Sequence, residues 1–223
     1  MLYYILSNNF VNKIINKINK DFIKYDEDFI SYYINFLKSV SLKIDLTSLP
    51  FFFITQINSF PLLEITLSLY NHQDKMIQSV VKNILLIMLK LNYPPLIDYL
   101  CCLPCLSYFS FISCRIKDLL QLISNQNNYE QYKSFQEDIV DEIIFIQDIF
   151  CLKIDKINHI LINSLLNYCI LPYIININYA IIKLNIKLYF LNVLFHFIQD
   201  EEFLNILFTI IFFPSHTKEI YNL

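Results

Sequence analysis

Among the side chains of this sequence, the cysteines most invite a chemical interpretation. Cys102 and Cys105 are separated by two residues, which is the spacing of one half of a zinc site. No second pair follows, and Cys114 with a remote histidine would complete a four-ligand set poorly. We therefore expect no metal and no other cofactor, and interpret the cysteines as reduced residues of a buried core. Metal binding and S-acylation of Cys101 or Cys102 stay open as alternatives.

The histidines offer little support for catalysis. They are dispersed along the chain and none stands in a His-Glu-x-x-His motif; they are His72, His159, His196 and His216. His72 is interpreted as a turn residue that satisfies backbone groups rather than as a general base. A hidden constellation around Cys151, Asp155 or His159 is the least favoured alternative, because no spacing supports it.

The chain contains no glycine, which excludes the P-loop, the glycine-rich dinucleotide turn and the usual nucleophile elbow. Carboxylates cluster at 26–28, 137–142 and 200–202, but no plausible acid or nucleophile accompanies them. Acids near helix starts interact favourably with the positive end of the helix dipole, which is how we interpret these clusters. The sequence therefore predicts no catalytic residues and no enzymatic activity.

Helices account best for the pattern of apolar residues. Between 29 and 44, and again between 77 and 91, apolar residues recur at helical spacing. Asp26 and Asp28 are placed to cap the first start, and Asp74 the second. Similar segments follow at 138–152, 157–176, 180–199 and 201–213. Without glycine, asparagine must serve at helix ends and tight turns, which helical folds tolerate better than β-rich ones. We predict an all-α fold, arranged as an irregular armadillo- or HEAT-like stack of helix pairs.

The domain organisation and the partners are bounded by length, charge and hydropathy. The 223 residues suit a single domain over 1–223, with the polar loop 124–134 as a weak boundary. A net charge of -3 and the absence of a basic stripe indicate no nucleic-acid partner. A mean hydropathy of +0.44 raises the alternative of an integral membrane protein with few spans. The longest run of low charge, 99–114, contains Pro104 and falls short of the roughly 20 residues that a spanning helix needs.

Several segments in order resemble one known family, the FPL-domain family, named for a Phe-Pro-Leu tripeptide. The segment 3–9 resembles the family's Tyr-Tyr-Leu-Leu-Ser-Asn-Asn, and 28–42 reads like its next helix. The tripeptide itself is matched by Phe60, Pro61 and Leu62, and the family's Asn-His turn by Asn71 and His72. Gln78 and Lys82 stand where the family pattern has arginines, which sets this chain apart in the following helix.

The resemblance, rather than any motif with chemistry, implies a function. Family members are large regulators of endosome-to-lysosome or vacuole transport and of autophagy. The resemblance thus implies a non-enzymatic scaffold or adaptor in the cytoplasm, peripherally associated with the cytosolic face of endosomal, Golgi or vacuolar membranes. Its partners would be other proteins, either vesicle-tethering or autophagy machinery or the remainder of a larger FPL protein. Because the chain is much shorter than family members, we expect a fragment or a reduced form. The tripeptide and the Asn-His turn identify the domain, and we interpret the tripeptide as packing.

Overall fold

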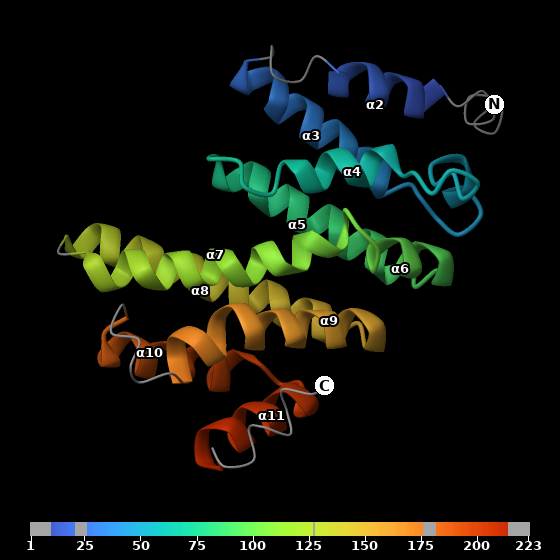
Figure 1. The fold of residues 1–223 in the computed structure, drawn as a ribbon. Helices are drawn as coiled ribbons and strands as arrows, with labels where there is room; N and C mark the ends of the chain where they lie inside the picture. Colours follow the sequence, from blue (N-terminus) through green and yellow to red (C-terminus); the bar gives the residue numbers. More distant parts are fainter. Residues whose placement is uncertain (1–9, 21–25, 127, 176–181, 214–223) are drawn as a thin grey trace. The chain divides into compact units, whose positions relative to one another are not determined.

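The computed structural model describes residues 10–20, 26–126, 128–175 and 182–213, and most of these lie in helices (Figure 1). Within this described part no β-strand occurs; a single isolated bridge joins Ile54 to Ser59. The predicted all-α class is confirmed, whereas the armadillo-like arrangement stays a prediction. The segment 3–9, used for the family resemblance, and His216 lie outside the described residues.

The chain divides into two compact units, Met1–Cys105 and Leu106–Leu223. In the first unit the helices are α2 (Phe10–Lys20), α3 (Glu27–Ser41), the short 3-10 helix η2 (Leu49–Phe51), α4 (Pro61–Ser68), α5 (Lys75–Lys90) and α6 (Pro94–Leu100). Helix α3 packs on α5, and α4 contacts α2, α3 and α5. Fully buried side chains such as Phe60, Leu62 and Ile84 form the core of this unit.

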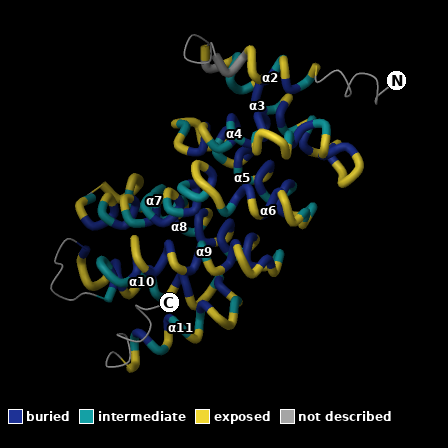
Figure 2. The backbone as a smooth tube through the Cα atoms, turned by 45° about the vertical axis from the view of Figure 1, so that its right-hand side comes forward, coloured by how far each residue is buried: buried dark blue, intermediate teal, exposed yellow. Residues whose placement is uncertain are grey.

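The second unit contains α7 (Leu106–Asn125), α8 (Tyr129–Phe150), α9 (Asp155–Leu165), the π-helical segment η3 (Leu166–Ile175), α10 (Leu184–Phe197) and α11 (Glu201–Phe212). The long helices α7 and α8 pack against each other, α9 and η3 cover α7, and α10 contacts both α7 and α8. Buried positions recur along the helices of this unit (Figure 2). Its core is made by apolar side chains from every one of these elements, among them Phe109, Phe190 and Phe203.

The polar stretch 124–134 is mostly helical in the structure. Helix α7 runs to Asn125 and α8 begins at Tyr129, capped by Asn128, whose side chain accepts a hydrogen bond from the Glu130 amide at 2.9 Å. The polar residues therefore form one exposed helical turn and a short connection rather than a long loop. Both helices belong to the second unit, and the single-domain prediction stays a prediction.

Two helix starts follow the sequence signals closely, whereas α8 begins at Tyr129, nine residues before the predicted start at 138. Asp26 caps α3 by accepting a hydrogen bond from the Phe29 amide at 2.8 Å, and Asp74 caps α5 by accepting from the Met76 amide at 2.7 Å. Both carboxylates satisfy amides that the first helical turn leaves without an internal partner. The predicted caps Asp26 and Asp74 are confirmed, whereas Asp28 lies within the first turn of α3.

Turns are made without glycine, as the composition requires. Positive φ angles occur at Asn58 (50°), Asn92 (45°) and Lys153 (53°) among the described residues. Asparagine tolerates this left-handed region better than other residues with a side chain, which confirms its predicted use at turns and helix ends. Lysine has no such tolerance, so Lys153, just beyond the end of α8, sits in an unfavourable backbone conformation.

Replacing Lys153 by glycine is expected to raise the free energy of unfolding by about 1 kcal/mol, because glycine has no Cβ to clash at positive φ. The matched control, Asn92→Gly, should change it by less than about 0.5 kcal/mol, since asparagine already tolerates this region. Urea denaturation followed by circular dichroism measures both values. A Lys153→Gly protein that is less stable than the parent would contradict this account of the turn.

Candidate protein-interaction site

The Phe-Pro-Leu tripeptide lies in the core of the first unit. Phe60 and Leu62 have no exposed surface, and Pro61 occupies the first turn of α4, where its missing amide hydrogen costs nothing. The ring of Phe60 packs against that of Phe53, with centroids 5.8 Å apart, and Phe53 in turn lies 5.3 Å from the ring of Tyr99. The surroundings of all three residues are those of packing side chains; their role as contacts stays a prediction.

One carboxylate organises the start of helix α4. Oε1 of Glu64 accepts hydrogen bonds from the Phe60 amide at 2.9 Å, from the Ser59 hydroxyl at 3.0 Å and from the Tyr99 hydroxyl at 2.9 Å. Burial raises the pKa of the Tyr99 hydroxyl, and the Glu64 carboxylate adds to that effect, so the phenol stays protonated and donates. Glu64 thereby ties α6 to the N-terminus of α4 beside the tripeptide.

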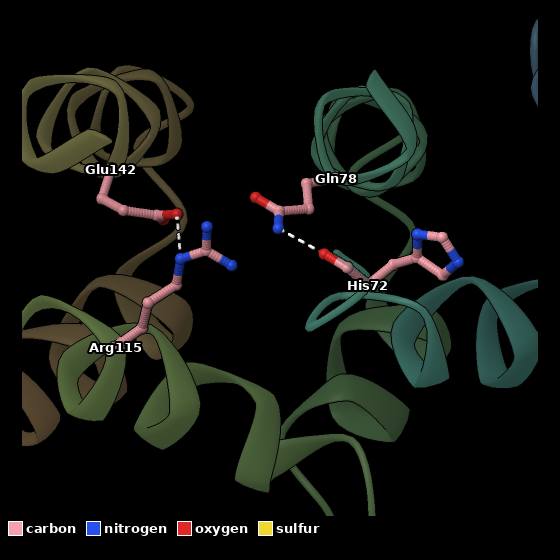
Figure 3. Close-up of polar contacts among 4 residues, drawn as sticks. All are labelled: His72, Gln78, Arg115 and Glu142. Atoms are coloured by element: carbon pink, nitrogen blue, oxygen red, sulfur yellow. Dashed lines mark hydrogen bonds and ion pairs between the residues drawn. The ribbon is translucent and has the colours of Figure 1, made fainter. Parts of the chain in front are cut away.

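The Asn-His turn connects α4 to α5 and is held by hydrogen bonds between side chains and backbone groups. Nδ1 of His72 accepts a hydrogen bond from the Asp74 amide at 3.1 Å, and the side-chain amide of Gln78 donates to the His72 carbonyl oxygen (Figure 3). Gln78, which stands where the family pattern has an arginine, therefore fastens α5 to the preceding turn. Asn71 is exposed in the same turn.

The cysteines divide between core and surface. Cys105 and Cys169 are buried, and burial raises the pKa of both thiols, which keeps them protonated and poorly nucleophilic. Cys102 and Cys151 are exposed, so the expectation of a buried core role is wrong for these two. Cys101 is half-buried. S-acylation of Cys101 or Cys102 stays a prediction, and no group of His, Cys, Asp or Glu side chains in the described ranges is arranged to hold a metal ion.

An ion pair that the sequence pattern did not reveal joins α7 to α8. Nε of Arg115, the chain's single arginine, lies 3.0 Å from Oε1 of Glu142 (Figure 3). The Glu142 side chain is 1% exposed and that of Arg115 is 19% exposed. Both charges also act on the buried phenol of Tyr108. Burial raises the pKa of this phenol, the Glu142 carboxylate raises it further, and the Arg115 guanidinium lowers it. The pair fixes one helix against the other and offers no reactive group.

A continuous apolar stripe on α10 is the best candidate for a protein-interaction site. Leu184, Leu188 and Phe195 are exposed by 71%, 58% and 45%, and Leu191, between them, is half-buried. These four positions are spaced by four, three and four residues, so they share one face of the helix. An apolar stripe of this kind gains free energy when a partner covers it. We call this set of four residues the α10 stripe.

Helix α11 carries a second exposed apolar group, made by Phe208 and Phe212 with Phe213 beyond the helix end. Their exposed fractions are 50%, 58% and 52%, and the rings of Phe208 and Phe212 lie 4.4 Å apart. Exposed phenylalanines on two successive helices are unusual for a surface that contacts only water. The sequence shows both segments as apolar on nearly every face, which hides the outward stripe among the buried residues.

The fold and these surfaces define an all-α protein whose candidate site is suited to protein contacts rather than to chemistry. Residues 1–89 match the family model FPL, which is described as an uncharacterised conserved protein. Together with the relatives below, this match confirms the predicted relationship to the FPL-domain family.

The relatives extend the similarity beyond the FPL segment. The chain is 32% identical over 179 residues to the Protein CLEC16A homolog of Drosophila melanogaster, an alignment that covers 77% of this chain and 16% of the relative. Protein CLEC16A of Homo sapiens is 30% identical over 180 residues, covering 77% of this chain and 17% of the relative. The Caenorhabditis elegans homolog is 40% identical over 85 residues, which are 38% of this chain and 9% of the relative. The chain thus spans a small part of the length of these relatives, and no solved structure matches it.

Among the helices of the described ranges, none is both long enough and apolar enough to cross a bilayer.

Proposed function

We propose that the protein is a scaffold or adaptor in endosome-to-lysosome or vacuole transport and in autophagy, and that it acts through protein contacts at the cytosolic face of endomembranes. The relationship to FPL-domain proteins supports the pathway, because the resemblance to that family implies a regulator of this transport. The α10 stripe supports the mode of action, and it is the single observation that carries the proposal. Vesicle-tethering or autophagy machinery, or a further part of a larger FPL protein, would cover this stripe.

The physical reasoning concerns the cost of leaving the stripe in water. Burying apolar surface is worth about 25 cal/mol per Å², so covering several leucine and phenylalanine side chains supplies a substantial part of a binding free energy. Aromatic residues contribute strongly to protein interfaces, and Phe195 is placed at the end of the stripe for that role. When a helix lies in a hydrophobic groove of a partner protein, the groove recognises apolar residues at this helical spacing.

Proximity labelling with the tagged full chain in its own cell tests the proposal. We expect enrichment of tethering and autophagy components, and a loss of most of that enrichment in the double variant Leu188→Ser with Phe195→Ser. The matched control is Leu122→Ser with Phe111→Ser, a leucine and a phenylalanine of α7 that are exposed by 50% and 51%. Arg115 and Asp118 interrupt the α7 face between them, so no continuous stripe exists there.

Carbonate extraction of the same membranes separates the proposal from the alternative of an integral membrane protein. A peripheral protein is released by carbonate, and we expect release. A carbonate-resistant chain without those neighbours would contradict the proposal. So would equal enrichment by the α10 and the α7 double variants, since the α10 stripe would then contribute nothing specific.

A further inference from the structure

Two cysteines stand at the ends of the turn that follows helix α6 in the first unit. Cys102 and Cys105 are separated by two residues, and 103–105 form a turn before α7 begins at Leu106. The Cα atoms at the first and fourth positions of a β-turn lie within about 7 Å of each other, and a disulfide bridges Cα atoms roughly 4.4–6.8 Å apart. The turn therefore brings the two side chains within reach of a shared covalent bond.

The two thiols differ in their access to solvent. Cys102 is exposed, whereas Cys105 is 3% exposed. Burial raises the pKa of the Cys105 thiol, and a charge on Cys102 raises it further, so the two sulfurs lie near enough to act on each other. An accessible thiol beside a second, protected thiol is the arrangement in which an oxidised cysteine goes on to form an internal disulfide.

Tyr99 of α6 supplies a polar partner for the buried thiol. Its hydroxyl donates to Oε1 of Glu64 at 2.9 Å and is also hydrogen-bonded to Cys105. The bond to Cys105 lowers the pKa of that thiol, against the larger effect of burial, because it stabilises the thiolate. Cys105 is thus protonated at rest, with a donor in place for the negative charge that develops on its sulfur when it attacks.

We propose that Cys102 and Cys105 form a reversible redox site at which hydrogen peroxide oxidises the two thiols to one disulfide. The Cys102 thiolate attacks a peroxide oxygen, the O–O bond breaks, and the displaced hydroxide takes up the proton of the Cys102 thiol and leaves as water. The Cys105 sulfur then attacks the sulfenic acid on Cys102: an S–S bond forms, the S–O bond breaks, and hydroxide leaves with the Cys105 proton as a second water. The two sulfurs together lose two electrons, and the peroxide gains them. A small dithiol reverses the reaction by exchange.

Thiol chemistry explains the spacing of the pair better than a metal ion does. Zinc in a structural site takes four ligands. Within the described ranges, no group of His, Cys, Asp or Glu side chains is arranged to hold a metal ion. A disulfide needs only the two sulfurs that the turn brings together.

This inference goes beyond the proposed function and does not depend on it. The pair lies in the first unit and the α10 stripe in the second, so failure of one leaves the other unaffected. Two hydrogen bonds lead from Tyr99, the partner of Cys105, to the start of α4: Tyr99 donates to Glu64, and Glu64 accepts from the Phe60 amide. The oxidation state of Cys105 is thereby linked to the turn that carries the Phe-Pro-Leu tripeptide.

Mass spectrometry on the full chain tests the site. The reduced protein is exposed to hydrogen peroxide, unfolded in denaturant and alkylated, so that every remaining thiol is marked. We expect Cys102 and Cys105 to escape alkylation together, in a peptide lighter by two hydrogens, and dithiothreitol to restore both thiols. A disulfide between Cys102 and any other cysteine would overturn the proposal. So would an alkylated Cys105 in a protein whose Cys102 is oxidised beyond the sulfenic acid.

A serine at Cys102 shows which thiol reacts first. Cys102→Ser changes an exposed position, and it should slow the oxidation of Cys105 by at least about tenfold, since a buried, protonated thiol is a poor nucleophile. The matched control is Cys151→Ser at another exposed cysteine, which should leave formation of the disulfide unchanged. A Cys105 that is oxidised as fast in Cys102→Ser as in the parent would refute the assignment.

A serine at Cys105 traps the first product. In Cys105→Ser the sulfenic acid on Cys102 should persist and be captured by dimedone, whereas the parent forms the disulfide instead. A Cys105→Ser protein that folds like the parent but yields no dimedone adduct at Cys102 contradicts the proposed sequence of steps.

Tyr99→Phe tests the donor beside Cys105. It should slow the disulfide step by about fivefold and leave the first oxidation of Cys102 unchanged, because only the attacking Cys105 sulfur loses a hydrogen bond. The control is Tyr93→Phe, which removes another phenol hydroxyl at the start of α6. Equal rates of disulfide formation in the two variants would contradict the role assigned to Tyr99.

Discussion

Replacing Arg115 by methionine is expected to lower the free energy of unfolding by about 3 kcal/mol, because the carboxylate of Glu142 stays buried without its cation. The geometry supports a large effect: the two side chains meet at 3.0 Å, and Glu142 is 1% exposed. Arg115 is the chain's single arginine, so no second guanidinium can take its place. Urea denaturation gives the free energy, and hydrogen exchange at amides of α7 and α8 assigns the loss to this pair of helices.

Two controls separate the buried pair from a general loss of positive charge. Lys133→Met removes a cation 4.0 Å from Glu137 on α8, but both side chains are more than 60% exposed, so the change should be about 0.5 kcal/mol or less. Adding Glu142→Leu to Arg115→Met removes the stranded carboxylate and should restore most of the lost stability. A single Arg115→Met variant that is as stable as the Lys133→Met control would show that Glu142 finds another partner.

Local signals made the helices predictable from the sequence. Asp26 and Asp74 stand three residues before runs of apolar spacing, and each cap rests on contacts within three residues, which a linear pattern can reveal. The use of asparagine at positive φ followed in the same way from the absence of glycine. The positive φ of Lys153 could not be predicted in this way, because no local rule favours lysine in that conformation.

The tertiary contacts could not be predicted from spacing. Arg115 and Glu142 lie on the two different helices of the α7–α8 hairpin. Whether their side chains meet depends on how these helices are rotated about their axes. A cleft of about 510 Å³ in the second unit is a stronger example, because Asp155 and Glu201, at the starts of two separate helices, both line it. The acidic cluster at 200–202 was interpreted as a helix start, which is the role of Asp200, but its neighbours also face a cleft. The contact of Glu64 with the Phe60 amide, four residues earlier, is local and could have been predicted from the sequence. Its contact with the Tyr99 hydroxyl, 35 residues away, could not.

Replacing Phe60 by alanine is expected to cost about 4 kcal/mol of stability, because a ring with no exposed surface is removed from a packed core and leaves a cavity. The loss should extend to the contacts of that ring with Phe53, whose own ring packs on Tyr99. Hydrogen exchange should report it in the first unit, at amides of α4 and α5, which pack together. Phe212→Ala, at a ring 58% exposed on α11, should change stability by about 0.5 kcal/mol or less.

A comparison of Phe60→Ala with Phe60→Leu decides whether the tripeptide packs or binds. If Phe60 packs, Phe60→Leu should recover most of the stability lost in Phe60→Ala, since leucine refills much of the volume. Partner enrichment in proximity labelling should then follow the fraction of folded protein in each variant. A Phe60→Ala chain that melts like the parent but loses its partners would instead make the tripeptide a contact. Its zero exposure argues against that outcome, because a side chain without accessible surface can reach a partner only after the first unit opens.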